Sequence, residues 1–174
     1  MTVLTTARLT LRRLTHDDAP FLVTLLNDPD FIRYIADRKV RTVADACRYL
    51  DAGPGAMYER YGFGLWLVTL TATGESIGIC GLLKREVFED VDLGFAFLPA
   101  FRSQGYAFEA ARGSLDYARD VLGLSRVVAV AQPDNERSHR LLGKLGFMRE
   151  GLTRLAADGP ELALFGVATR GDLP

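Results

Sequence analysis

A polar segment between an expected strand and an expected helix holds the first residues that could do chemistry. The segment reads Arg102-Ser103-Gln104-Gly105-Tyr106-Ala107. The apolar run before it, residues 91–98, predicts a strand, and the pattern after it predicts a helix to about residue 122. Where a strand turns at a glycine into a helix, backbone N–H groups stay unpaired and the helix end carries about half a positive charge. The segment therefore suits a phosphate or pyrophosphate, although Gly105 alone would equally fit a role in relieving crowding.

A second segment begins about 30 residues after Gly105. It reads Asn135-Glu136-Arg137-Ser138-His139-Arg140-Leu141-Leu142-Gly143-Lys144-Leu145-Gly146-Phe147. Asn135 is expected to cap a helix, and spacings of three and four place Ser138 on the same inward face as the leucines. A hydroxyl on that face needs a hydrogen-bond partner, which is either a ligand or the helix backbone.

These segments are positioned by a regular succession of strands and helices. Strands are predicted from Leu9 and over residues 64–71, 76–83, 91–98, 127–131, 147–155 and 162–169. Helices are predicted over residues 16–26, from residue 42 to about residue 60, from the glycine turn to residue 122, and over residues 135–145. Gly53-Pro54-Gly55 is expected to interrupt the second helix. The order β-α-α-β-β-β-α-β-α-β-β predicts an α+β or mixed α/β fold around one central sheet.

Composition narrows the class of protein. The chain has 174 residues, of which 48% are hydrophobic and 25% charged, and its net charge is −1. These values predict a single domain over residues 1–174 and argue against a nucleic-acid partner or a basic membrane-binding patch. No apolar run approaches the roughly 18 residues of a membrane span, and no signal peptide is evident. We therefore expect a cytoplasmic monomer or homodimer without a metal, since Cys47 and Cys80 lack metal-ligand spacing.

Taken together, the two segments resemble the motifs of the GNAT superfamily of acyl-CoA N-acyltransferases. The shared pattern is a strand, the Arg-x-x-Gly-x-Ala turn, a helix, a strand, and an asparagine-capped helix that ends at Gly146-Phe147. The opening Ala-Arg-Leu-Thr-Leu-Arg-Arg-Leu-Thr, the Asn27-Asp28-Pro29 turn and residues 105–110 resemble the Rim-type branch, which includes acetyltransferases of ribosomal-protein N-termini. The resemblance implies a mostly antiparallel, twisted sheet of about seven strands with helices on both faces. It also implies that the sheet splays between the strand that ends at Leu98 and the strand that starts at Val127.

The resemblance further implies a binding site for acetyl-CoA as cosubstrate. Backbone N–H groups would hold its pyrophosphate along Arg102, Ser103, Gln104, Gly105, Tyr106 and Ala107. The strand end would hydrogen-bond the pantetheine arm through Phe95, Ala96, Phe97 and Leu98. An N–H near Phe97 would polarise the thioester carbonyl, and Asn135 and Ser138 would lie beside the pantetheine arm. An amine would then attack the thioester directly, so that much of the catalysis would come from positioning.

The residues for proton transfer are less strongly patterned. Many family members carry a tyrosine seven residues after the motif asparagine, where this chain has Leu142. Ser138 is the replacement that the Rim-type branch suggests, acting through a water or as a hydrogen-bond donor, because a serine hydroxyl is a poor acid. Asp92, on the strand that leads to the cofactor, is either a proton relay or a solvated hairpin acid.

Three other titratable residues near these segments are expected to have structural roles. We expect His16 and His139 to be surface residues and not bases. Glu109 follows Gly105 by one helical turn, which favours an anchor for the loop or for the helix dipole.

The expected acceptor is an amine of a small molecule or of a protein N-terminus. An α-amine titrates at about 8 and lysine at about 10.4, so a site without an evident strong base favours the α-amine. Two other functions remain open: a non-catalytic acyl-CoA sensor, which Leu142 in place of tyrosine permits, and a nucleotide-binding enzyme. The chain lacks both Gly-x-x-x-x-Gly-Lys-Ser/Thr and Gly-x-Gly-x-x-Gly, which argues against the second.

Overall fold

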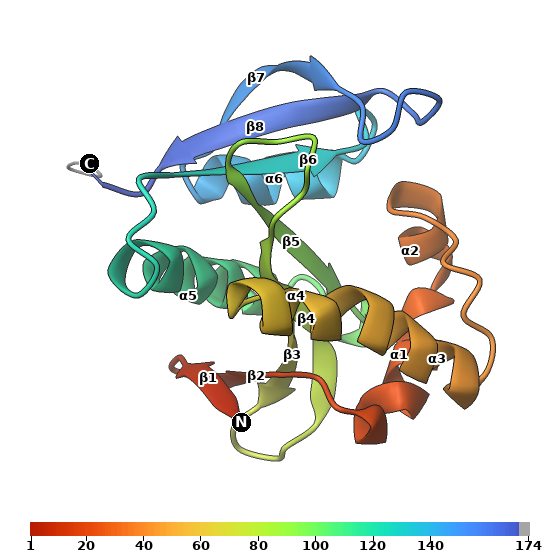
Figure 1. Cartoon of the computed structure of the whole chain (residues 1–174). Helices are drawn as coiled ribbons and strands as arrows, with labels where there is room; N and C mark the ends of the chain where they lie inside the picture. Colours follow the sequence, from red (N-terminus) through yellow and green to blue (C-terminus); the bar gives the residue numbers. More distant parts are fainter. Residues whose placement is uncertain (171–174) are drawn as a thin grey trace.

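One eight-stranded sheet runs through the molecule, with helices on both of its faces (Figure 1). The computed structural model describes residues 1–170, so residues 171–174 of the expected domain lie outside the described part. The strands are β1 (Thr2–Thr5), β2 (Leu9–Arg12), β3 (Leu65–Leu70), β4 (Ser76–Leu83), β5 (Val91–Phe97), β6 (Arg126–Ala131), β7 (Met148–Thr153) and β8 (Leu162–Ala168). The α-helices are α1 (Ala19–Leu26), α2 (Pro29–Tyr34), α3 (Val43–Leu50), α4 (Ala56–Tyr61), α5 (Tyr106–Asp120) and α6 (Glu136–Lys144). Shorter helical turns are η1 (His16–Asp18), η2 (Asp51–Gly55) and η3 (Pro99–Phe101).

The strand order β1-β2-β3-β4-β5-β6-β8-β7 places one parallel pair inside an otherwise antiparallel sheet. That pair, β5 and β6, is joined only at Val91–Val127 and Asp92–Val128. Beyond these two positions the strands diverge, whereas β4 and β5 stay paired over six positions. The predicted splay between β5 and β6 is therefore confirmed, and it opens toward the turn that leads into α5.

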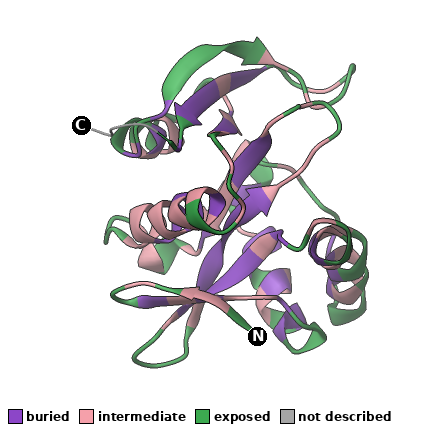
Figure 2. Ribbon diagram, turned by 60° about the vertical axis from the view of Figure 1, so that its left-hand side comes forward, coloured by how far each residue is buried: buried purple, intermediate pink, exposed green. Residues whose placement is uncertain are grey.

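Alternation of side chains along each strand sends neighbouring residues into two separate cores. On one face α5 packs against the sheet, and Trp66 of β3 meets Tyr117 of α5 edge-on at 5.1 Å between ring centres. On the other face α1 and α3 pack, and Ile79 of β4 belongs to this core. Along β5, Leu93 belongs to the α5 side and Ala96 to the α3 side. Figure 2 shows the result, with buried residues concentrated in the central strands and exposed residues on the outer helices and loops.

The beginning of the chain differs from the sequence prediction in two places. β1 adds a strand to the expected seven, because residues 6–8 turn back and pair it with β2. The helix expected from residue 16 opens instead as the 3₁₀ turn η1. Pro20 lies in the first turn of α1 and has no N–H to donate to the His16 carbonyl, so regular α-helical bonding cannot start there.

Gly53-Pro54-Gly55 does not interrupt the second helix, contrary to prediction. These residues lie in η2, a π-helical turn that joins α3 to α4 in one continuous helical run (Figure 1). The wider turn accommodates Pro54, which lacks the N–H that an α-helix requires. Gly55 is needed here because a Cβ at this position would lie 3.0 Å from the carbonyl oxygen of Leu50.

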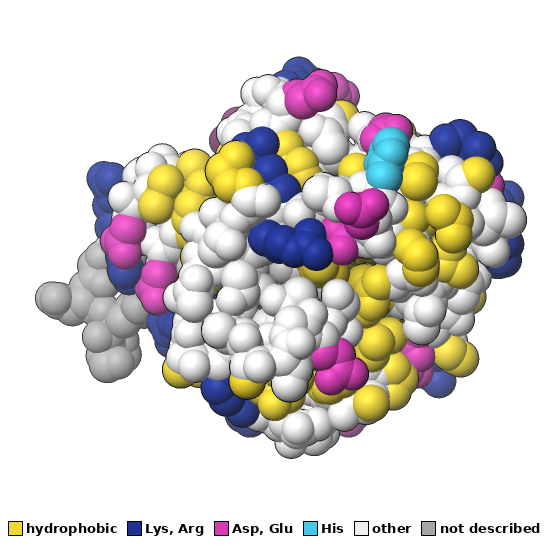
Figure 3. Space-filling view, turned by 90° about the horizontal axis from the view of Figure 1, so that it is seen from below, with side chains coloured by type: hydrophobic (Ala, Val, Ile, Leu, Met, Phe, Trp, Pro, Cys, Tyr) yellow, Lys and Arg dark blue, Asp and Glu magenta, His cyan; other side chains and the backbone are white. Residues whose placement is uncertain are grey.

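The surface and the cysteines add two further observations. Acidic and basic side chains are interspersed on the face seen from below (Figure 3), in keeping with the net charge of −1. Within residues 1–170, no helix is both long and apolar enough to span a membrane. Both cysteines are free, and burial raises the pKa of the Cys80 thiol to about 12, which keeps it protonated at neutral pH.

Candidate active site

The β5–α5 loop (residues 102–107) presents a row of unpaired backbone N–H groups. Gly105, in the left-handed conformation with a φ of 81°, starts α5. In the part of the chain that the structure describes, the N–H groups of residues 103–107 donate to no acceptor. Ser103 also has a positive φ, of 60°, and successive N–H groups in such a turn converge on a concavity that accepts anions. The geometry of residues 103–107 is therefore consistent with the anion site that the sequence predicts for this loop.

Arg102 does not contribute a free N–H to this row, contrary to the prediction. Its N–H donates to the carbonyl of Pro99 at 3.2 Å and closes η3. Its guanidinium is also occupied: Nη1 donates to Asp30 at 2.7 Å, Nη2 to Asp28 at 2.8 Å, and Nε to the Phe97 carbonyl at 3.2 Å. Arg102 therefore holds the end of β5 against α2. Its charge is already neutralised by two carboxylates, so its guanidinium is not available to bind a phosphate.

Arg8 lies against the same loop, although nothing in the sequence singled it out. Its Nη1 donates to the Gln104 carbonyl at 3.0 Å, and its guanidinium lies 4.3 Å from the centre of the Tyr106 ring. A Cβ added to Gly105 would lie 3.3 Å from Nη2 of Arg8. A side chain at position 105 would therefore crowd Arg8, and N–H donors and a cation surround the concavity. These features fit the pyrophosphate of a CoA ester.

Glu109 anchors the loop from inside α5, as the sequence predicted. Its carboxylate accepts hydrogen bonds from Thr6 Oγ1 at 2.6 Å, from the Arg8 N–H at 2.7 Å and from Arg8 Nε at 2.7 Å. Burial acts to raise the pKa of Glu109, but the bonds from Thr6 and Arg8 outweigh it and hold this pKa below its usual value. The β1–β2 turn is thereby fixed to the first turn of α5.

We expect the substitution Glu109→Gln to lower the free energy of unfolding at pH 7 by about 2 kcal/mol, since it removes hydrogen bonds to a charged group. A carboxyl whose pKa is lowered in the folded state contributes stability above its unfolded pKa of about 4.3, and this is lost as the pH falls through the folded pKa. Urea unfolding from pH 7 to pH 3 should therefore show the wild-type advantage shrinking below about pH 4. Glu136→Gln, at a mostly exposed position on α6, is the control with almost no effect.

The end of β5 divides its backbone groups between β4 and the splay. The N–H of Leu98 donates to the Ile77 carbonyl at 3.0 Å, and the register pairs Ala96 with Ile79. Antiparallel bonding alternates, so the N–H groups of Ala96 and Leu98 both point toward β4. The predicted role of these two N–H groups in holding pantetheine is therefore wrong. Phe95 and Phe97 direct their N–H groups into the splay, where a ligand can pair with them.

Asn135 and Ser138 open α6 as the sequence predicted. The Asn135 side chain accepts a hydrogen bond from the Ser138 N–H at 3.3 Å and caps the helix. Ser138 is half-buried, and its hydroxyl has no hydrogen-bond partner within residues 1–170. Leu142 is 1% exposed and belongs to the hydrophobic core. The position where the family usually has tyrosine therefore faces the core in this chain. Ser138 remains the candidate for a polar group that could assist proton transfer.

Neither histidine is positioned as a base. His16 is exposed and bonded to Asp51 at 2.7 Å, as a surface residue is expected to be. His139 differs from the prediction because it is half-buried: Nε2 meets the Gln132 carbonyl at 2.9 Å and the ring packs edge-on against Phe165. The hydrogen bonds of His16 and His139 therefore serve the local structure around each ring.

Asp92 lies at the base of the splay, on the last pair that joins β5 to β6. It is 1% exposed, and Nε of Arg85 lies 3.2 and 3.3 Å from its two oxygens. Burial raises the pKa of Asp92 above its usual value, and the charge of Arg85 acts against this rise. The interpretation of Asp92 as a solvated hairpin acid is therefore wrong, because the carboxylate is buried and paired.

This arrangement matches a known family over most of the chain. The family model described as Acetyltransferase (GNAT) domain matches residues 8–148, a stretch that contains the β5–α5 loop, the splay and α6. The chain belongs to the GNAT acetyltransferases. Members of this family use acetyl-CoA as the acetyl donor, so the chain is an acetyl-CoA-dependent N-acetyltransferase.

Individual GNAT relatives match this chain over most of its length. The uncharacterised N-acetyltransferase YoaA of Bacillus subtilis is 30% identical over 153 residues, covering 87% of this chain and 86% of that protein. An acetyltransferase structure from Agrobacterium tumefaciens superposes with a TM-score of 0.80 at 26% identity, covering 96% and 94% of the two chains. The RimL ribosomal-protein acetyltransferase, solved with coenzyme A, superposes with a TM-score of 0.82 at 16% identity, covering 97% and 98%. This last likeness concerns the fold alone.

Proposed function

We propose that this GNAT enzyme acetylates an α-amine, with acetyl-CoA bound along β5 and the β5–α5 loop. The observation that carries the proposal is a set of unpaired N–H groups in two places, at Phe95 and Phe97 on β5 and at residues 103–107 of the β5–α5 loop. A pantetheine arm has amide groups that can pair with the first two. The pyrophosphate matches the remainder, beside Arg8 and the start of α5.

In this arrangement the neutral amine attacks the thioester carbonyl, the C–N bond forms, and the C–S bond breaks. The N–H of Phe97 lies in the splay, where it can donate to the oxygen on which negative charge develops. The leaving sulfur takes up one proton and departs as the CoA thiol. The acceptor, which starts as an ammonium ion, loses a second proton to solvent. No acyl-enzyme is needed, because the amine attacks the thioester directly.

We expect Ser138→Ala to lower kcat by about five- to tenfold while leaving acetyl-CoA affinity within about twofold. The half-buried hydroxyl has no protein partner and lies at the start of α6, where it can donate to the leaving sulfur or to a water beside it. Steady-state rates at saturating donor, together with calorimetric titration of acetyl-CoA, separate the two quantities. An unchanged kcat would remove Ser138 from the mechanism.

We further propose that the enzyme belongs to the Rim-type branch and that its acceptor is an α-amine and not a lysine side chain. Asp92 is tied to Arg85, and both histidines are bonded elsewhere, so a strong base for a lysine acceptor is not in evidence among these groups. Thiol release should be compared for a peptide with a free N-terminus and for one with a blocked N-terminus and an internal lysine. We expect the free N-terminus to react faster. Faster reaction of the lysine peptide would refute the α-amine, and acetyl-CoA binding without release on any amine would indicate a sensor.

A further inference from the structure

One carboxylate oxygen is shared by arginines from the two sides of the splay. Oδ2 of Asp30, on α2, accepts hydrogen bonds from Arg102 Nη1 at 2.7 Å and from Arg137 Nη2 at 3.1 Å. Arg102 follows the end of β5, and Arg137 lies in the first turn of α6, which follows β6. Because β5 and β6 are the strands that diverge, Asp30 connects the two sides at the end where the strands are not paired with each other.

A second ion pair joins α2 to the start of α6. Arg33 Nη2 lies 3.6 Å from Oδ2 of Asp134, the residue before the helix cap Asn135. Figure 1 shows α2 standing above α3, to the right of β5. We call the side chains that meet here the α2 network: Asp28, Asp30, Arg33, Arg102, Asp134 and Arg137.

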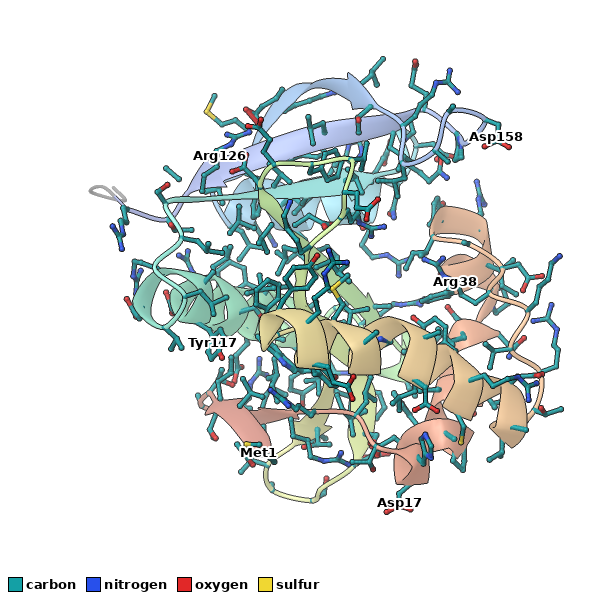
Figure 4. The ribbon with its side chains drawn as sticks, viewed as in Figure 1. Met1, Asp17, Arg38, Tyr117, Arg126 and Asp158 are labelled. Atoms are coloured by element: carbon teal, nitrogen blue, oxygen red, sulfur yellow. The ribbon has the colours of Figure 1, made fainter. Side chains whose placement is uncertain are left out.

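The closed end of the splay is fixed by other groups. There β5 and β6 are joined by their two residue pairs, and Arg126 Nε donates to Asp90, which precedes β5, at 3.1 Å. Figure 4 shows Arg126 at the start of β6, on the opposite side of the view from α2. Backbone pairing and Arg126 therefore set the width of the closed end, whereas the α2 network spans the open end.

The two attachments of α2 differ in their exposure to water. Toward β5, the ion pair of Arg102 with Asp28, the cap of α2, is only 20% and 8% exposed. Toward α6, Arg137 is 49% and Arg33 is 66% exposed. An exposed ion pair contributes about 1 kcal/mol or less and is weakened by salt, whereas breaking a buried one costs more. The helix α2 is therefore held firmly to β5 and weakly to α6.

The α2 network lies next to the two groups that the proposed transfer needs. Arg102 Nε donates to the carbonyl of Phe97, whose N–H is the proposed oxyanion donor. Arg137 is adjacent in sequence to Ser138, the proposed group beside the leaving sulfur. Phe97 and Ser138 thus belong to opposite sides of the splay, and both must reach one thioester. Their separation has to be held close to one value for the reaction to proceed efficiently.

We propose that α2 sets the width of the splay at its open end and so positions Phe97 and Ser138 about the thioester. Arg33 and Arg137 are the positioning residues on the α6 side, and the inference rests on the proposed function. The three acids and three arginines of the network balance in charge, which favours a role in holding distance over the attraction of a charged ligand. The groups proposed to bind the donor lie on β5 and the β5–α5 loop, so acetyl-CoA affinity does not depend on the attachment to α6.

The test removes both ion pairs to α6 and follows thiol release from acetyl-CoA with the faster amine of the peptide comparison. We expect Arg33→Gln/Arg137→Gln to lower kcat about fivefold while the KM for acetyl-CoA stays within about twofold. Each single variant should keep kcat within about twofold, because the other ion pair remains. Arg48→Gln/Arg140→Gln is the matched control, since it removes two exposed arginines that pair within α3 and within α6, and it should keep wild-type rates.

Two further measurements separate positioning from a general structural role. The wild-type kcat should fall as NaCl rises from about 0.05 to about 0.5 M, whereas the double variant should start low and change little. Exchanging the charges of one ion pair, by Arg33→Asp/Asp134→Arg in the Arg137→Gln background, should keep kcat near the wild-type value. The same background with Arg33→Asp alone should show the full loss.

A wild-type kcat in Arg33→Gln/Arg137→Gln would overturn the role of α2 and leave acetyl transfer intact. If no amine releases thiol although acetyl-CoA binds, the proposed function itself fails, and the width of the splay is then measured directly. Spin labels on Ile32→Cys and Lys144→Cys, both at exposed positions, report the distance from α2 to α6 in a Cys47→Ala background. A longer or broader distance distribution in the double variant supports the α2 network, and an unchanged distribution refutes it.

Discussion

Gly105→Val is expected to raise the KM for acetyl-CoA by at least 100-fold. Residue 105 has a φ of 81°, a conformation that a β-branched residue adopts only with strain. The new side chain would also lie about where the pyrophosphate is expected, since a Cβ there already comes within 3.3 Å of Arg8 Nη2. A 100-fold loss corresponds to about 2.7 kcal/mol of binding energy. Steady-state kinetics with varied acetyl-CoA and calorimetric titration should agree on this loss.

The chain offers a closely matched control at the other end of α5. Gly123 has a φ of 67°, and a Cβ there would lie 3.3 Å from Nη2 of Arg170. Gly123→Val therefore introduces the same backbone strain and the same kind of contact, far along the helix from the β5–α5 loop. Both variants should lose about 2 kcal/mol of stability, but only Gly105→Val should lose acetyl-CoA affinity. Equal donor affinities in the two variants would show that the loop does not bind the pyrophosphate.

The second large effect is expected for Arg102→Ala. This change leaves Asp28, whose side chain is 8% exposed, without its cation, and it frees the carbonyl of Phe97. Breaking a buried pair by removing one partner costs about 3 kcal/mol or more, which for a chain of this size lowers the Tm by roughly 6 to 12 °C. Because the end of β5 also loses its tie to α2, kcat/KM for acetyl-CoA should fall about 10- to 100-fold. Calorimetric melting and initial rates below the lowered Tm measure the two effects.

Arg137→Ala provides the comparison for this prediction. Arg137 donates to Asp30 at 3.1 Å but is 49% exposed, and Asp30 keeps its bond to Arg102 in the variant. A loss of less than about 1 kcal/mol is expected, with kcat/KM nearly unchanged. Similar losses in both variants would contradict the role of Arg102 as the tie between β5 and α2.

The parts of the site that could be predicted from the sequence depend on short-range patterns. Gly105 is marked by its place between a strand and a helix, and Asn135 by the cap position before an amphipathic stripe. Which residues of β5 face the splay could not be predicted in this way, because the choice between Phe97 and Leu98 depends on the register with β4. A shift of one residue would exchange the two sets of N–H groups.

The side chains around the loop were predicted less well because their partners are distant in sequence. Glu109 could be identified as an anchor, but its partner Arg8 lies 101 residues earlier. Arg102 was placed on the phosphate for the same reason, since its carboxylate partners Asp28 and Asp30 lie more than 70 residues earlier in the chain. Local patterns thus predict the backbone of the proposed donor site, whereas the charged side chains that hold this backbone in place are known only from the fold.

The meagre pairing of β5 with β6 has a consequence for how the molecule opens. Two residue pairs connect the part of the sheet formed by β1 to β5 with the part formed by β6, β8 and β7. Native-state hydrogen exchange should therefore reveal two cooperative units that open with different free energies. Bound acetyl-CoA would bridge them as a missing strand does, so amides on both sides of the splay should slow together. In this proposal acetyl-CoA donates the acetyl group and also links the two parts of the sheet, so each binding event stabilises the fold.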